Sequence, residues 1–125
     1  MTYRRNLLPK HALQRLKENP QALFVDVRSE AEYKFVGYPE NSVLIPWTDE
    51  PYWEPKPEKF SEAVRKKLES YEDIYETEII LICRSGYRSN EALKCLESEG
   101  FKHVSHVASG FEGDLDEDDQ RGNLN

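Results

Sequence analysis

The sequence predicts an α/β domain in which helices cover both faces of a mainly parallel β-sheet. Short apolar segments rich in β-branched residues alternate with segments that have helical periodicity, an order typical of such a sheet. The strongest strand segment, "TEIILIC" (77–83), is apolar throughout instead of alternating, which indicates burial on both faces. A chain of 125 residues suits one domain and can bury a core without disulfide bonds.

Three further segments are predicted to complete the sheet. They are the apolar runs "ALFVDVR" (22–28), "SVLIPW" (42–47) and "HVSHVAS" (103–109). Pro46 stops the run at 42–47, because proline has no N–H to give to a neighbouring strand.

Four helices are predicted where apolar residues recur at helical spacing. They lie at residues 9–18, 29–35, 58–71 and 89–99. Pro9 suits a first helical position, and Ser29 and Glu32 have the spacing of a capping box. The segments expected to be irregular are the Pro- and Trp-rich residues 47–57 and the acidic residues 110–125.

The charge balance limits the partners. The chain has 17 Lys and Arg against 24 Asp and Glu, a net charge of −7, which disfavours nucleic acid or an anionic membrane as the main partner. No apolar run has the length of a signal peptide or a membrane span, and two cysteines twelve residues apart form no metal motif. We therefore expect a cytoplasmic protein with reduced cysteines and no metal or other cofactor.

The candidate site is the segment "CRSGYRS" (83–89). Its cysteine ends a predicted parallel strand, the end of the sheet at which α/β proteins bind ligands. Gly86 lets the loop curl with its N–H groups inward, and the following helix adds partial positive charge at its N-terminus. Arg84 and Arg88 add full charge, and the loop contains no acidic residue. Together these groups favour the thiolate of Cys83 over the thiol.

Two interpretations of Cys83 compete. A lone cysteine at the end of an apolar strand is often an inert packed residue. Two arginines beside a buried structural thiol would be hard to satisfy, however, so chemistry is the favoured interpretation. His103 and His106 could approach Cys83 only through folding and carry little weight, so the sequence predicts a nucleophile without a paired general base.

Four motifs, in order along nearly the whole chain, resemble the single-domain rhodaneses, which are sulfurtransferases. The motifs are "FVDVRSEAEY" (24–33), "GYPENSVLIPW" (37–47), the loop at 83–89 and "GFKHVSHVASGFEG" (100–113). Tyr38 stands where the family usually has His, and Asn41-Ser42 replaces a common Gly-Ala, but neither departure touches the loop.

The resemblance implies a single rhodanese-like domain over residues 1–125 with an acidic C-terminal loop at about 112–125. It implies that Cys83 takes sulfane sulfur from a donor such as thiosulfate as a persulfide and passes it to cyanide or a thiol. A protein sulfur acceptor is a further expected partner. The residues expected to bind the anionic donor are Arg84, Ser85, Gly86, Tyr87, Arg88 and Ser89. Asp26 and Arg28 are expected to order the neighbouring loops.

Other residues receive mainly structural interpretations. Trp47 and Trp53 are interpreted as packing rather than as substrate contacts, and Cys95 as structural rather than as a resolving thiol. The residues expected to form a wall of the pocket are Ser109, Gly110 and Phe111. The acidic cluster at 114–119 is interpreted as a solvated loop rather than a cation site.

Two alternatives remain for the function. A cysteine-dependent phosphatase loop resembles C-x-x-G-x-x-R-[ST], whereas here Arg88 comes one residue early and Ile82 replaces the usual His. The shorter loop suits a sulfur atom better than a phosphoryl group. A non-turnover sulfur carrier or protein-binding module is the second alternative, and the sequence does not separate it from an enzyme.

Overall fold

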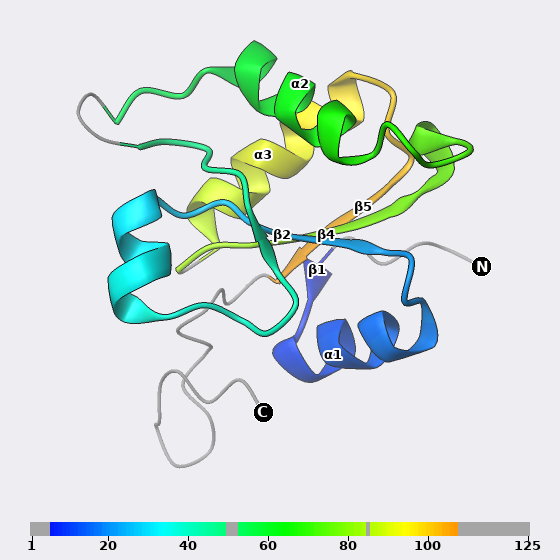
Figure 1. The fold of residues 1–125 in the computed structure, drawn as a ribbon, viewed down its shortest axis with the longest axis horizontal. Coiled ribbons are helices and arrows are strands. Elements are labelled where there is room, and N and C mark those ends of the chain that lie inside the picture. The colour runs from blue at the N-terminus through cyan, green and yellow to red at the C-terminus, as the bar shows by residue number, and fades with distance from the viewer. Residues whose placement is uncertain (1–5, 50–52, 85, 108–125) are drawn as a thin grey trace.

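The computed structural model describes residues 6–49, 53–84 and 86–107, and it confirms the predicted α/β fold (Figure 1). Five strands form one sheet in the order β1-β5-β4-β2-β3, and every neighbouring pair runs parallel. The strands are β1 (Asn6–Leu7), β2 (Leu23–Asp26), β3 (Val43–Leu44), β4 (Glu78–Ile82) and β5 (His103–Val107).

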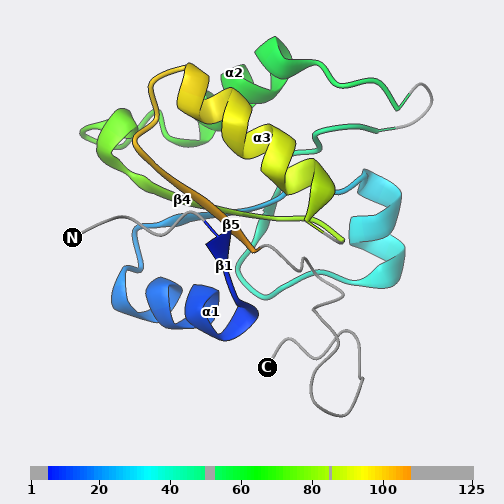
Figure 2. The same cartoon turned by 180° about the vertical axis from the view of Figure 1, so that it is seen from behind.

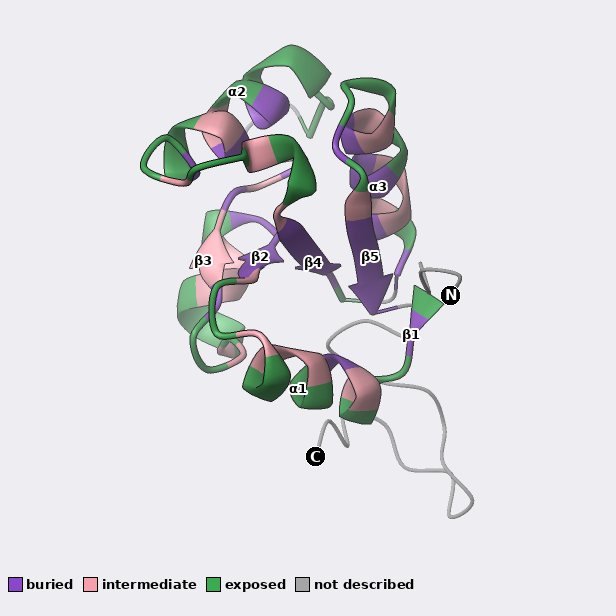
Figure 3. Cartoon of the chain, turned by 90° about the vertical axis from the view of Figure 1, so that its right-hand side faces the viewer, coloured by how far each residue is buried: buried purple, intermediate pink, exposed green. Residues whose placement is uncertain are grey.

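Helices cover both faces of the sheet, as the sequence predicted. α1 (Pro9–Glu18) lies on one face, and α2 (Pro57–Lys67) and α3 (Tyr87–Ser98) lie together on the other (Figures 1 and 2). The larger apolar cluster fills the space between the sheet and α2 and α3, and a smaller one lies under α1. β4 and β5 are almost wholly buried between these layers (Figure 3). No helix within the described ranges is long and apolar enough to cross a bilayer.

The regular parts of β2 and β3 are shorter than predicted. The backbone N–H of Ile45 still donates to the carbonyl of Asp26 at 3.0 Å, and that of Trp47 donates to Val27 at 2.9 Å. Between these two bonds lies Pro46, which has no N–H to donate. The chain therefore stays beside β2 as far as Trp47, although the regular ladder ends earlier.

The helices also differ from their predicted bounds. α3 begins at Tyr87 rather than 89, because Gly86 adopts the positive φ of 98° that turns the chain into the helix. α2 spans 57–67 instead of 58–71, yet Tyr71 still packs against the core. The predicted helix at 29–35 contains a π-helical turn, η1 (Glu32–Val36), and a 3₁₀ turn, η2 (Ile74–Glu76), precedes β4.

The connections leave β2 and β4 in opposite directions. The chain passes from β2 outward to β3 at one edge, and from β4 through α3 to β5 toward the other edge. β2 and β4 are neighbours, so the loops after their carboxyl ends diverge, and this is the position at which α/β sheets typically bind ligands. Cys83 follows β4 directly at this point.

Candidate active site

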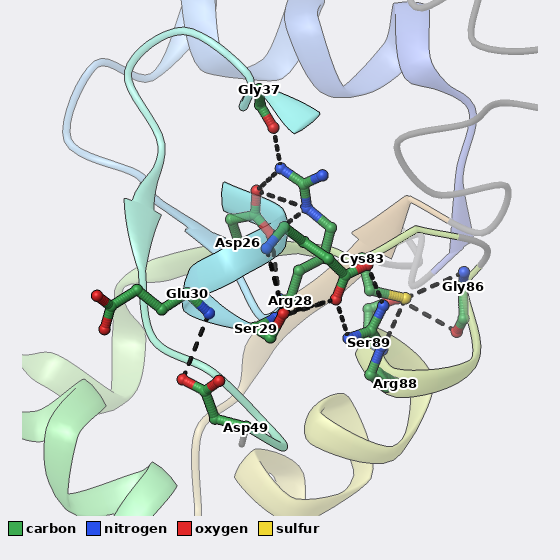
Figure 4. A network of polar contacts seen from close by, with 11 residues as sticks. Asp26, Arg28, Ser29, Glu30, Gly37, Asp49, Cys83, Gly86, Arg88 and Ser89 are labelled. Carbon is green, nitrogen blue, oxygen red and sulfur yellow. Dashed lines mark hydrogen bonds and ion pairs between the residues drawn. The ribbon is translucent and has the colours of Figure 1, made fainter. Parts of the chain in front are cut away.

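Cys83 lies in a cradle of backbone donors at the end of β4 (Figure 4). Its Sγ atom accepts hydrogen bonds from the N–H of Gly86 at 3.1 Å and from the N–H of Ser89 at 3.3 Å. The positive φ of Gly86 folds the loop back over the sulfur, and the second donor belongs to the first turn of α3. The residue is only 1% exposed, so these two N–H groups act in a low-dielectric setting where they stabilise negative charge on sulfur.

Some of the remaining loop residues are buried beside the sulfur, and others are exposed at the surface of the loop. The Ser89 side chain is fully buried, whereas Arg84 is exposed and Tyr87 is 74% exposed. Ser85 lies outside the described residues. The cradle therefore consists of backbone groups and Ser89, and the side chains of Arg84 and Tyr87 form its outer rim.

Arg88 has an acidic partner that the sequence analysis did not anticipate. Its two terminal nitrogens donate to the two oxygens of Glu32 at 2.7 and 3.0 Å. These hydrogen bonds lower the pKa of Glu32 to about 2, against the opposing effect of partial burial. The expectation that no acid opposes the arginine charges holds within the loop but not in the folded protein. Arg88 ties the start of α3 to η1 instead of presenting a free guanidinium to Cys83.

Glu32 also caps its own helical turn, as predicted. Its N–H donates to Ser29 Oγ at 3.2 Å, and its Oε1 atom accepts from the Ser29 N–H at 3.2 Å. This is the reciprocal pattern of a capping box. One carboxylate thus holds both the start of η1 and the start of α3.

Asp26 and Arg28 order the neighbouring loop from inside the protein. Both side chains are buried, and the Arg28 guanidinium donates to Asp26 Oδ1 at 2.9 Å and Oδ2 at 2.7 Å. Arg28 also donates to the carbonyl of Gly37, which joins the end of β2 to the loop before β3 (Figure 4). The two side chains thus join the end of β2 to the loop before β3, and their expected role in supporting the site stays a prediction.

A histidine reaches the cradle from β5. Ser89 Oγ lies 3.5 Å from Cys83 Sγ and 2.8 Å from Nδ1 of His106, a buried residue. Nε2 of His106 lies 3.0 Å from Oδ1 of Asn6 in β1. His103 instead contacts Glu76 at 3.1 Å.

The sequence analysis gave His106 little weight. One signal was available: a histidine in the predicted strand at 103–109, which runs parallel to the strand that precedes the cysteine. The register pairs His106 with Leu81, two residues before Cys83.

Of the other singled-out residues, Trp47 and Cys95 pack against the protein, Trp53 does not show the packing expected of it, and the rest lie outside the described residues. Trp47 is buried and meets Phe60 edge-on, with ring centroids 5.3 Å apart, whereas Trp53 is about half exposed. Cys95 is half-buried with Sγ 3.7 Å from the Pro57 carbonyl, and burial raises the pKa of its thiol. Both cysteines are free. The expected pocket wall at 109–111 and the acidic residues 112–125 fall outside the described ranges.

Comparison with known proteins decides the family. The sequence profile of the rhodanese-like domain matches residues 9–117. The chain belongs to the rhodanese-like domain family. The crystal structure of Rv0390 from M. tuberculosis, 31% identical, superposes on this rhodanese-like domain with a TM-score of 0.74, over 97% of this chain and 89% of that one. The polysulfide-sulfur transferase homodimer from Wolinella succinogenes, 27% identical, gives a TM-score of 0.65 over 94% of this chain and 77% of that one.

The curated relatives carry a different kind of name. The tRNA uridine(34) hydroxylase of Hamiltonella defensa is 30% identical over 104 residues, which are 83% of this chain and 26% of that protein. A protein of the same name from Escherichia fergusonii is 29% identical over 85% of this chain and 27% of its own length. The rhodanese-like domain thus spans about a quarter of the curated relatives that it matches.

Proposed function

We propose that this rhodanese-like domain is a sulfurtransferase in which Cys83 carries sulfane sulfur as a persulfide. The donor is a small anion such as thiosulfate, and the acceptor is cyanide, a small thiol or a thiol on a partner protein. The domain is proposed to occupy residues 1–125 and to work in a reducing compartment such as the cytoplasm, because the chemistry needs a free thiol. No metal or cofactor takes part in the proposed reaction.

One observation carries the proposal: two backbone N–H groups converge on the Cys83 sulfur, at 3.1 and 3.3 Å. Such donors favour the thiolate, which is the nucleophilic form. Exposed Arg84 at the rim adds a positive charge that would attract an anionic donor.

The reaction has two displacement steps. The Cys83 thiolate attacks the outer sulfur of thiosulfate, a new S–S bond forms, and the old S–S bond breaks with its electron pair leaving on sulfite. An acceptor such as cyanide then attacks the outer sulfur of the persulfide. Thiocyanate leaves, and the thiolate of Cys83 is regenerated.

The geometry supports sulfur transfer over phosphatase chemistry. A phosphatase loop holds phosphate oxygens with the planar, bidentate fork of the arginine near the end of the loop, just before the Ser or Thr. Here both terminal nitrogens of that arginine, Arg88, donate to Glu32. The arginine that a phosphate would need is therefore engaged in holding α3 to η1.

The experiment that tests the proposal is intact-mass measurement after incubation with thiosulfate and again after cyanide. We expect the mass of one sulfur atom to be added and then removed, with thiocyanate released. Cys83→Ser should abolish both steps, and Cys95→Ser, the matched control, should leave both intact. Added sulfur that maps to Cys95, or hydrolysis of an aryl phosphate at a rate equal to sulfur transfer, would contradict the proposal.

Repeated turnover separates the enzyme from a carrier. With excess thiosulfate and cyanide, an enzyme releases many equivalents of thiocyanate per chain. Release that stops after one equivalent would favour the carrier, which delivers its sulfur to one protein partner.

A role linked to tRNA is a second candidate, favoured by the names of the curated relatives. The net charge of −7 opposes stand-alone binding to RNA, because backbone phosphates reward a basic surface. Binding of unmodified tRNA, measured by fluorescence anisotropy at low and at physiological salt, tests it. Micromolar binding that survives physiological salt would favour the RNA-linked role.

A further inference from the structure

We propose that Ser89, His106 and Asn6 form a proton relay that takes the proton from the Cys83 thiol. The relay would make His106 a positioning residue and proton acceptor, two hydrogen bonds away from the sulfur. Its benefit to sulfur transfer rests on the proposed function, but its effect on the thiol is measurable without any sulfur donor.

The first observation is that a buried polar side chain stands where an apolar one would suffice. His106 is 4% exposed in a strand whose other inward positions hold small or apolar residues. A buried imidazole must satisfy both ring nitrogens. A histidine with a purely structural role could have any polar partners, whereas one partner of His106 is Ser89, which in turn contacts Cys83.

The second observation is the direction of the hydrogen bonds. Nε2 of His106 lies 3.0 Å from Asn6 Oδ1, an oxygen that can only accept a hydrogen bond. This contact assigns the ring proton of the neutral imidazole to Nε2, so Nδ1 carries no proton and can accept from Ser89. Ser89 has one hydroxyl proton and two acceptors in reach, Nδ1 of His106 at 2.8 Å and the Gly86 carbonyl at 3.2 Å. The shorter contact directs the proton to Nδ1. The serine oxygen is then open to the Cys83 thiol, whose Sγ donates to it at 3.5 Å.

The step balances within the protein. The thiol proton passes from Cys83 to Ser89 Oγ while the hydroxyl proton of Ser89 passes to Nδ1 of His106. The products are a thiolate and an imidazolium ion, and the serine is unchanged. The imidazolium then donates through both nitrogens, to Ser89 and to Asn6, and its charge stabilises the thiolate across the serine.

Charged groups from several elements also surround the thiol, and they stay constant in the test. Arg88 on α3 is paired with Glu32 of η1, Asp26 at the end of β2 is paired with Arg28 just after it, and Arg84 lies exposed beside the cysteine. Because both ion pairs remain in every variant, a change in thiol ionisation reports the relay.

The experiment measures the second-order rate of iodoacetamide alkylation of Cys83 between pH 5 and 10. All proteins carry Cys95→Ser so that only one thiol reacts. We expect His106→Asn to lower the rate at pH 7 by about tenfold and to move the profile to higher pH, the size expected for loss of a hydrogen-bonded charge partner. Ser89→Ala keeps the backbone donor but removes the hydroxyl, and it should have an effect of the same size.

Three comparisons make the result decisive. His103→Asn on the same strand should leave the alkylation profile unchanged. The double variant of Ser89 and His106 should be no slower than either single variant, because the two act as one unit. If His106→Asn does not fold, as judged by circular dichroism, Ser89→Ala and Asn6→Ala at the sheet edge provide the test. Profiles that superpose on the parent, or effects of Ser89 and His106 that multiply, would overturn the relay.

These outcomes separate the relay from the proposed function. If the relay fails while the thiosulfate adduct still forms on Cys83, sulfur transfer stands without it. If the alkylation profile shifts but no adduct forms, the relay stands and the sulfur donor is wrong.

Discussion

Replacing Glu32 by glutamine removes the charge that holds α3 to η1, and the structure fixes the size of the effect. The pKa of Glu32 falls from its ordinary value of 4.5 to about 2, mainly through its hydrogen bonds from Arg88. A shift of that size corresponds to at most about 3 kcal/mol of folding free energy. The two side chains are 20% and 21% exposed, so solvent screening reduces the expected loss in Glu32→Gln to about 1–2 kcal/mol at pH 7.

The pH dependence has a definite sign. A carboxyl whose pKa is lowered by folding stabilises the folded state fully above its unfolded pKa, and this contribution is lost as the pH falls through the folded value. The difference in unfolding free energy between the parent and Glu32→Gln should therefore be constant above about pH 4.5 and shrink between about pH 4.5 and 2.

Urea denaturation of both proteins at pH 7, 4 and 2.5 measures this difference. The matched control is Glu30→Gln, which loses only an exposed pair with Lys34 and should leave the urea midpoint nearly unchanged. A difference that stays the same from pH 7 to 2.5 would show that Glu32 acts through its shape or its cap rather than through its charge. Equal losses in the two variants would refute the distinction between the partly buried pair and the exposed pair.

Three further predictions concern other parts of the site. Asp26→Asn leaves the buried Arg28 charge without its counterion and should cost about 3–5 kcal/mol in urea unfolding, and a loss below 1 kcal/mol would contradict the buried pair. Gly86→Ala places a side chain at φ 98° and should lower the free energy of unfolding by about 1–2 kcal/mol, and intact-mass measurement should show slower persulfide formation. An unchanged rate would show that the conformation of this turn does not affect the reaction of Cys83. Because burial raises its pKa, Cys95 in a Cys83→Ser background should react with iodoacetamide only at higher pH than a free cysteine peptide, and a matching profile would refute its burial.

Short sequence patterns predicted the features that depend on neighbouring residues alone. The apolar run before Cys83 gave β4 and the position of the thiol at the end of a parallel strand, and the spacing of Ser29 and Glu32 gave a capping box that forms. β1 was missed because two residues carry no periodicity, and its pairing with β5 spans 100 positions. The start of α3 was placed two residues late because glycine has no side chain to mark a cap.

The missed parts of the site are contacts between distant segments. Arg88 and Glu32 lie 56 residues apart, and nothing near either residue reveals the pairing. The serine of the loop and His106 lie 17 apart on different elements, and only the strand order brings them together. The sequence therefore predicted the position of the thiol and its loop, whereas the contacts of Arg88 and Ser89 with distant residues depended on the topology.

The loop separates two properties. The stabilisation of negative charge on the Cys83 sulfur comes from backbone N–H groups, whereas the exposed rim around the cradle consists of the side chains of Arg84 and Tyr87. The N–H groups of Gly86 and Ser89 that face the sulfur belong to the backbone, so at position 89 every residue except proline supplies the same donor, whereas position 86 also needs the positive φ of glycine. Arg84 and Tyr87 are exposed at the surface of the loop. If the domain transfers sulfur as proposed, substitutions at these two positions would change the preference for a donor or an acceptor while the backbone donors at the sulfur stay in place.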